Sequence, residues 1–199
     1  MDPQQLAIWA DQFNDLFRID HKIPINVKPL QPTSLDMETF IAMMPEPFKM
    51  AADMAALDKS MTRSLTRVHD IPDDLLDYLR LQSRKIDSLM RFMLLQQDDP
   101  AFRLISLSYG GSALTFNRAE PLAAGELIET RLFLEHNAGA VYAWARVIDC
   151  EPSTEGFVIR STFTHIQDED RENIVRASLQ EQSRQLKRKA EQRQLQGKL

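Results

Sequence analysis

The chain lacks the residues that stabilise small proteins covalently or through metals. It has one cysteine, Cys150, so no disulfide can form within it, which agrees with a reducing compartment. Its four histidines are scattered along the sequence without the spacing of metal ligands. We therefore expect neither a metal nor a resident cofactor.

Long apolar runs and excess positive charge are also absent. No run approaches the roughly 20 apolar residues of a membrane span, and no early segment has the pattern of a signal peptide, so we expect a cytoplasmic protein that does not bind membranes. A net charge of -5 argues against a general nucleic-acid binder. With 199 residues, 43% of them hydrophobic, the chain can bury one core, or a core with a helical appendage.

Patterns typical of enzymes are missing too. Ser108 has no histidine nearby in the sequence to act as a base, and Asp73, Asp74 and Asp77 resemble the acidic start of a helix rather than a catalytic pair. Gly110-Gly111 lacks the Lys-Ser or Lys-Thr that would follow in a phosphate-binding loop of the Walker type. We expect a protein that is not an enzyme.

The first 46 residues predict a helix followed by a linker. Apolar residues recur at helical intervals between 6 and 17, which favours a short amphipathic helix. From 23 to 32, three prolines alternate with Ile25 and Val27, which favours an extended connection.

Two long helices are predicted next, over 48–68 and 75–97, with a break at Asp70-Ile71-Pro72. Their apolar residues step by three and four, close to a coiled-coil seam interrupted by Ser83. This favours an oligomerisation region over 47–98; the alternative is a helical subdomain packed on its own barrel. The residues expected at an interface between copies are Met54, Leu57, Met61, Leu65, Leu76, Leu79, Ile86, Met90 and Met93.

Near Pro100 the apolar period changes from 3.6 to 2. Alternating runs predict strands over 102–105, 113–116, 126–135, 141–148 and 157–163. Five or six short antiparallel strands suggest a small closed barrel, because closure removes exposed sheet edges. A final helix beginning near Asp168 would cover the barrel, which gives an α+β fold with the barrel and its helix over 99–185.

The turn Ser106-Leu107-Ser108-Tyr109-Gly110-Gly111 between the first two of these strands has two interpretations. It is a plain hairpin in which the glycines take positive φ, or a turn whose N–H groups and hydroxyls face a phosphate. The basic tail over 186–199 likewise has two: a solvated, frayed helix end, or a surface for acidic partners or nucleic acid.

The order of elements resembles the PilZ domain family. The carrying features are the strand, the Ser-x-Ser-x-x-Gly turn, the further antiparallel strands, and the segment 163–176 entering a helix. The resemblance covers roughly 72 to 185 and implies a six-stranded antiparallel barrel with a C-terminal helix, in a family where many members bind cyclic di-GMP. The long helices before the barrel are similar to those of an atypical, tetramer-forming branch.

The family's ligand motifs are only partly present. Its second motif is Asp or Asn, x, Ser, x, x, Gly; Ser108 and Gly111 match it, while Ser106 replaces the acid or amide and loses its reach toward a guanine. Its first motif, Arg-x-x-x-Arg, has the spacing of Arg80 and Arg84, which lie inside a predicted helix where arginines commonly pair with acids.

The sequence therefore predicts a non-catalytic, homo-oligomeric adaptor of cyclic di-GMP signalling, tetrameric by the resemblance, that acts through an unidentified protein partner. The alternative is a direct cyclic di-GMP receptor that uses Arg80, Arg84 and the 106–111 turn.

Overall fold

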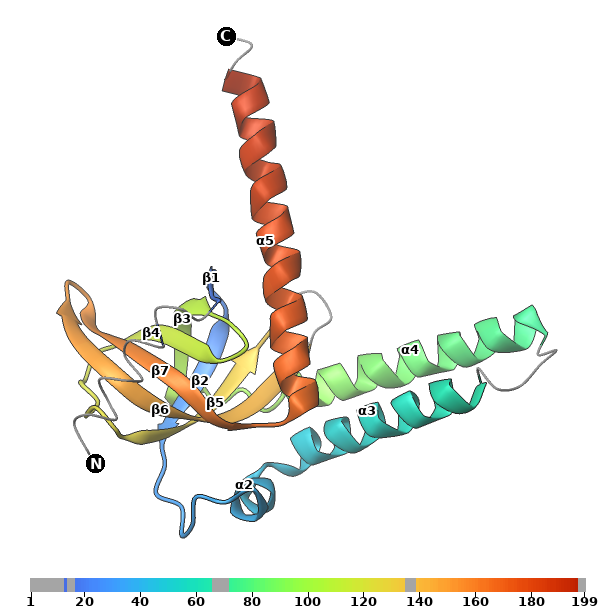
Figure 1. Ribbon diagram of the computed structural model, residues 1–199, viewed down its shortest axis with the longest axis horizontal. Helices are drawn as coiled ribbons and strands as arrows, with labels where there is room; N and C mark the ends of the chain where they lie inside the picture. Colours follow the sequence, from blue (N-terminus) through green and yellow to red (C-terminus); the bar gives the residue numbers. More distant parts are fainter. Residues whose placement is uncertain (1–12, 14–16, 66–71, 135–138, 197–199) are drawn as a thin grey trace.

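Six antiparallel strands close into a barrel in the computed structural model, which describes residues 13, 17–65, 72–134 and 139–196 (Figure 1). The strand order is β3-β2-β5-β6-β7-β4, and the pairing of β3 with β4 closes the ring. A two-residue strand, β1, adds to β3. The bounds are β1 Ile19–Asp20, β2 Pro24–Pro29, β3 Arg103–Tyr109, β4 Ala113–Arg118, β5 Leu127–Phe133, β6 Ala140–Ser153 and β7 Gly156–Ile166. The predicted six-stranded barrel is confirmed.

The barrel interior follows the predicted alternation. Ile128, Thr130 and Leu132 are fully buried on the inner face of β5, and Glu129 and Arg131 lie on the outer face. The inner residues of all six strands form one apolar cluster, to which α5 (Asp168–Gln196) adds Ile174 and Ala177. The hydrophobic effect thus fixes the register, because a slip of one residue would expose this whole set.

The prediction of a mere connection over 23–32 is wrong. The segment is extended, as expected, but residues 24–29 are the barrel strand β2, which pairs with β3 and β5 and buries Ile25 and Val27. Prolines at both ends of β2 concealed it, because proline cannot donate to a sheet ladder and reads as a strand breaker.

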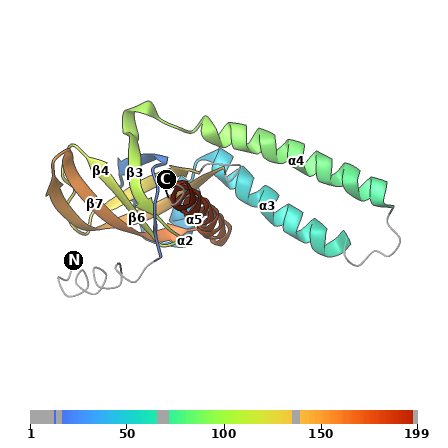
Figure 2. The same ribbon diagram turned by 90° about the horizontal axis from the view of Figure 1, so that it is seen from above.

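Three helices are inserted between β2 and β3. They are α2 (Met37–Met43), α3 (Glu46–Leu65) and α4 (Asp73–Leu95), and the last two form an antiparallel pair, here called the arm, that projects from the barrel (Figures 1 and 2). The two long helices are confirmed, except that positions 66–68 of the first lie outside the described residues. The helix predicted between 6 and 17 also falls largely outside them.

The sequence interpretation missed α2, whose start has a recognisable signal. Asp36 caps the helix, since its carboxylate accepts from the Thr39 N–H at 2.7 Å and from the Ser34 hydroxyl. These two hydrogen bonds lower the pKa of Asp36 to about 2. Phe40 is the fully buried residue of this short helix, so α2 packs through Phe40 against the outer surface of the barrel.

Both faces of β6 are buried for this reason. Its inner residues fill the barrel, while Tyr142 and Trp144 on the outer face lie under Phe40 of α2 and Phe48 of α3. Ring centroids are 5.3 Å apart for Phe40 and Trp144 and 5.7 Å apart for Phe48 and Tyr142. This second core holds the arm to the barrel.

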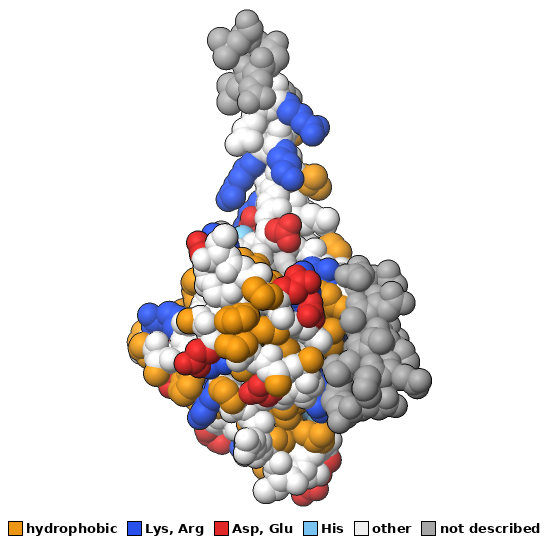
Figure 3. All heavy atoms as spheres, turned by 90° about the vertical axis from the view of Figure 1, so that its left-hand side faces the viewer, with side chains coloured by type: hydrophobic (Ala, Val, Ile, Leu, Met, Phe, Trp, Pro, Cys, Tyr) orange, Lys and Arg blue, Asp and Glu red, His pale blue; other side chains and the backbone are white. Residues whose placement is uncertain are grey.

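The C-terminal helix α5 begins on the barrel and then leaves it, as Figure 3 shows for its upper part. Buried positions recur at Ile174, Ala177, Ser178 and Glu181, one face of the helix. Beyond Gln185 the described side chains are exposed, and several are Lys or Arg. No helix in the described part of the chain is long and apolar enough to cross a membrane.

Candidate functional site

The 106–111 turn is the strongest candidate from the sequence, and it forms a hairpin end. Strands β3 and β4 pair on either side of it with a bulge between Ser106 and Ser108, and the Gly110 N–H donates to the Ala113 carbonyl at 2.9 Å. Neither Gly110 nor Gly111 has a positive φ, unlike Gly125 and Gly156 at other turns. The expected reason for the paired glycines is therefore wrong.

Close packing explains the two glycines instead. A Cβ on Gly110 would overlap the backbone carbonyl oxygen of Phe17, and one on Gly111 would lie 2.6 Å from Val175 Cγ2 on α5. The Arg171 guanidinium of α5 also donates to the Gly111 carbonyl at 2.7 Å. Glycine is required here because other parts of the chain touch the turn's backbone.

The first serine of the motif is occupied by the chain itself. Ser106 is fully buried, its hydroxyl donates to the His21 carbonyl at 2.9 Å, and its oxygen accepts from the Ile23 N–H at 3.0 Å. Ser108 is 7% exposed and pairs with Asp20 of β1. Both serines are thus buried, and residues between 17 and 23 bond to or pair with each of them.

The two candidate arginines lie elsewhere. Arg80 and Arg84 are exposed on α4, and Arg80 forms an ion pair with Asp77 at 2.9 Å. A rise of 1.5 Å per residue puts Arg84 about 16 Å along the helix from its barrel end at Leu95. Within one protomer the structure does not bring these arginines together with the turn (Figures 1 and 2).

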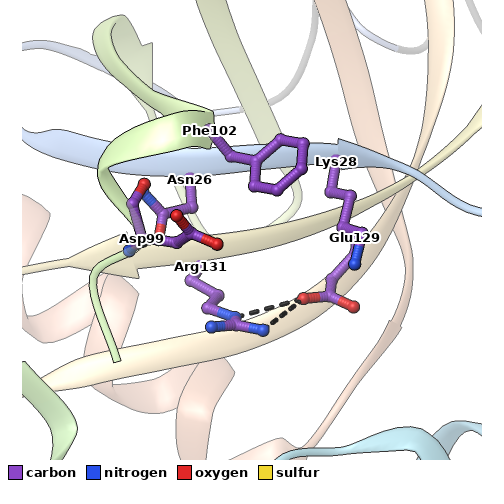
Figure 4. A pocket seen from close by; sticks show the side chains of 6 residues that line it. All are labelled: Asn26, Lys28, Asp99, Phe102, Glu129 and Arg131. Atoms are coloured by element: carbon purple, nitrogen blue, oxygen red, sulfur yellow. Dashed lines mark hydrogen bonds and ion pairs between the residues drawn. The ribbon is translucent and has the colours of Figure 1, made fainter. Parts of the chain in front are cut away.

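A small pocket opens where the arm returns to the barrel, and the sequence did not predict it. Its lining comes from β2, β5, the short 3-10 turn η1 (Pro100–Phe102) and the N-cap residue of that turn. Figure 4 shows the six residues that line it: Asn26, Lys28, Asp99, Phe102, Glu129 and Arg131.

The polar groups of this pocket fasten the arm. Asn26 is buried; its Oδ1 accepts from the Asp99 N–H at 2.7 Å, and its Nδ2 donates to Asp98 Oδ1 at 2.9 Å. Arg131 donates to the Gln97 carbonyl at 2.9 Å and through two nitrogens to Glu129 Oε1. These hydrogen bonds, which we call the clamp, hold the segment that follows α4 against the barrel. In the sequence, only the alternating polar residues of two strands indicated them.

The clamp continues into the second core. The Tyr142 hydroxyl lies 3.4 Å from Glu129 Oε2 and accepts from the Trp144 indole N–H at 3.0 Å. Burial and the nearby Glu129 carboxylate raise the pKa of Tyr142, so it stays a neutral phenol. Hydrogen bonds therefore run continuously from the Gln97 carbonyl, just after α4, through Arg131, Glu129 and Tyr142 to Trp144 in the second core.

Most of the exposed large hydrophobic side chains in the described part of the chain lie on the arm. The residues of this surface, which we call the arm stripe, are 38% to 66% exposed: Leu57, Met61, Leu75, Tyr78, Leu81, Ile86, Leu89, Phe92 and Met93. Side chains of this size rarely lie open together on a monomer. The stripe is therefore the main candidate for an interface.

The interface residues expected from the sequence fall into two groups. Met54, Leu76 and Leu79 are half-buried and Met90 is buried, so part of the predicted seam lies within the protomer, in the region where Ser83 faces Asp58 of α3 at 3.4 Å. Leu57, Met61, Ile86 and Met93 belong to the arm stripe. The side chain of Leu65 lies outside the described part of the chain.

Comparisons with known proteins point to one family. The family model for the PilZ domain matches residues 79–180, about half of the chain. No curated protein matches the sequence.

Two solved structures match this chain in whole or in part. A pathogenic protein from Xanthomonas campestris, described as a new tetrameric PilZ domain self-assembled via an unusual helical bundle, is 16% identical with a TM-score of 0.53, and the match covers 92% of this chain and 98% of that one. The inhibitor of motility MotI/DgrA of Bacillus subtilis is 17% identical with a TM-score of 0.38 over 41% of this chain and 42% of its own. At 16% identity, the Xanthomonas structure shows a shared fold alone.

Proposed function

The chain belongs to the PilZ domain family, and on that premise we propose that it is a non-catalytic signalling adaptor of bacterial cyclic di-GMP pathways. It works in the cytoplasm as a homo-oligomer, with four copies favoured, and acts through a protein partner. Two observations carry the proposal: the arm stripe is exposed, and the 106–111 turn is covered by other parts of the chain.

The turn supports an adaptor over a receptor. Ser106 already exchanges two hydrogen bonds with His21 and Ile23, and both glycines are covered by other parts of the chain. A ligand at this turn would first have to break those contacts. Arg80 and Arg84, the other half of the expected site, lie on the arm.

The arm stripe supports self-association through a bundle. Residues advance by about 100° around a helix, and the stripe on each helix is rotated in the same sense from the α3–α4 seam. Because the helices are antiparallel, the same sense of rotation puts both stripes on one side of the arm. Burying such a face stabilises by about 25 cal/mol per Å² of apolar surface.

The Xanthomonas structure offers a precedent for four copies. It contains a PilZ domain described as tetrameric and assembled through a helical bundle, and the fold match extends over nearly all of this chain. We take fourfold assembly through the arm as the corresponding arrangement here.

The test is sedimentation velocity of the full chain and a double variant, Leu89→Lys with Phe92→Lys. Both side chains are more than 60% exposed in the protomer, so the fold should tolerate the changes. The matched control, Asp77→Lys, adds a lysine on the polar side of the same helix. We expect the double variant to be a monomer and the control to remain assembled; assembly that survives in the double variant would refute the arm as the interface.

The receptor alternative has its own measurement. Titration calorimetry with cyclic di-GMP should show no saturable heat with the wild-type chain. Saturable binding that is lost in Arg84→Ala would favour a direct receptor over the adaptor.

A further inference from the structure

Three large apolar side chains of α5 lie on its exposed side. Val175, Leu179 and Leu186 are 37%, 49% and 62% exposed. At about 100° per residue they fall within about 40° of one another, and they point away from Ile174 and Ala177, which belong to the barrel core. The outer part of α5 extends clear of both the barrel and the arm (Figure 1). The helix therefore has an apolar stripe of its own, separate from the arm stripe.

The same face of α5 is acidic at its start and basic at its end. Steps of three and four residues extend the apolar stripe back to Glu172 and Asp168 and on to Lys189 and Arg193. All four of these charged side chains are exposed. The face, which we call the α5 seam, thus runs from negative charge through apolar side chains to positive charge.

The α5 seam is symmetric about its midpoint. Residues at equal distances from that point are opposite in charge or both apolar, and the innermost pair combines an apolar side chain with a neutral amide. The pairs are Asp168 with Arg193, Glu172 with Lys189, Val175 with Leu186, and Leu179 with Gln182. A second α5 laid antiparallel on the first would bring the members of each pair together. A parallel one would place like charges opposite each other.

We propose that α5 pairs antiparallel with α5 of a second copy of this chain through the α5 seam. Alternating steps of three and four residues keep a seam between two helices aligned along their length. The contact is self-complementary, as a twofold contact between identical copies requires. Its apolar centre is buried by pairing, and each acidic start meets the basic end of the other helix.

This contact goes beyond the proposed function, because it uses a surface other than the arm. Two different twofold contacts, one through the arm stripe and one through the α5 seam, are enough to close four copies. Each copy contributes only three large apolar side chains to the seam, so pairing through α5 alone is weak. The double variant Leu89→Lys with Phe92→Lys is therefore still expected to be a monomer at tens of micromolar.

Disulfide trapping in the full chain tests the pairing, with Cys150→Ser as the background so that only added thiols react. Antiparallel pairing puts residue 172 of one copy opposite residue 189 of the other, whereas within one chain the two positions are about 26 Å apart. A chain with both Glu172→Cys and Lys189→Cys should form disulfide-linked dimers about tenfold faster than either single variant. The single variants are matched controls, because antiparallel pairing keeps two copies of one position about 26 Å apart as well.

The role of charge is tested in the same chain with both added cysteines. Arg193→Glu places like charges opposite Asp168 in both halves of the contact and should slow cross-linking about threefold. The control, Lys187→Glu, makes the same change in net charge about a quarter of a turn away from the α5 seam and should slow it less. Equal slowing by the two substitutions would refute the pairing of Asp168 with Arg193.

Equal cross-linking rates in the double and single cysteine variants would overturn the proposal, and single variants that react faster would indicate parallel helices. Light scattering of the chain without added cysteines reports assembly separately. A monomer mass together with fast cross-linking would contradict the proposed function alone, whereas an assembled chain with slow cross-linking would contradict the pairing of α5 alone.

Discussion

The barrel buries its large apolar side chains within one protomer, and the arm leaves many of its own exposed. In the barrel, the inner faces of six strands meet and almost nothing large remains open, whereas the arm buries one side of each helix and leaves the arm stripe in solvent. A closed ring of strands pairs all its strand edges and buries its apolar face within one copy. A pair of projecting helices cannot bury all its apolar side chains in this way, so we assign folding to the barrel and association to the arm.

The largest effect should come from truncating the barrel core. Phe116 is fully buried, and Phe116→Ala should lower the free energy of unfolding by about 3–5 kcal/mol, through lost burial and a cavity. Phe92→Ala on the arm, where the ring is 63% exposed, should change that of the dissociated protomer by less than about 0.5 kcal/mol. Denaturant melts of dilute samples measure both; equal losses would erase the distinction between the two regions.

A partly buried acid at the start of α5, Asp170, should make barrel stability depend on pH. Burial raises the pKa of Asp170 to about 7, although its carboxylate accepts from the Tyr142 N–H. Since the folded state favours the protonated form, this group's contribution is complete below about pH 4 and is lost as pH rises to about 7.

Asp170→Asn keeps an acceptor and removes the charge. It should therefore be more stable than the wild type by about 2–4 kcal/mol at pH 8, with the difference disappearing near pH 4. Thermal melts across this range are the measurement. A variant less stable than the wild type at pH 8 would show that the ionised carboxylate stabilises the helix.

The clamp between the regions should have an intermediate effect. Asn26→Ala removes the partners of Asp98 and Asp99 at the arm's exit and should cost about 1–3 kcal/mol. Lys28→Ala on the same strand loses an exposed amine near the Phe102 ring and should cost less than about 1 kcal/mol. Small-angle scattering should also show a wider range of arm positions in Asn26→Ala; an unaltered profile would mean that the second core alone fixes the arm.

The smallest effect belongs to the arm's surface charges. Arg80→Ala breaks an ion pair with Asp77 in which both side chains are about 70% exposed, and it should change stability by less than about 0.5 kcal/mol. A denaturant melt that shows a loss above 1 kcal/mol would assign Arg80 a structural contact beyond Asp77.

Periodicity was sufficient to predict most of the fold, because α3, α4 and five strands carry apolar residues at the regular spacing of their secondary structure. It failed at β2 and α2, where prolines and shortness hide the pattern and the partners are remote in sequence. The site was less predictable: Ser108 and Gly111 match a motif by residue type, but only packing reveals that Phe17 and Val175 cover the turn. Asn26 and Arg131 lie on strands more than 100 residues apart in the sequence, so no local pattern predicts that they line one pocket.

The mass of the unmodified chain in solution tests the central claim most directly. Light scattering at tens of micromolar should give a multiple of 22.9 kDa, with four copies expected, and the mass should fall on dilution. A mass of 22.9 kDa at every concentration would mean that the arm stripe does not join copies of this chain.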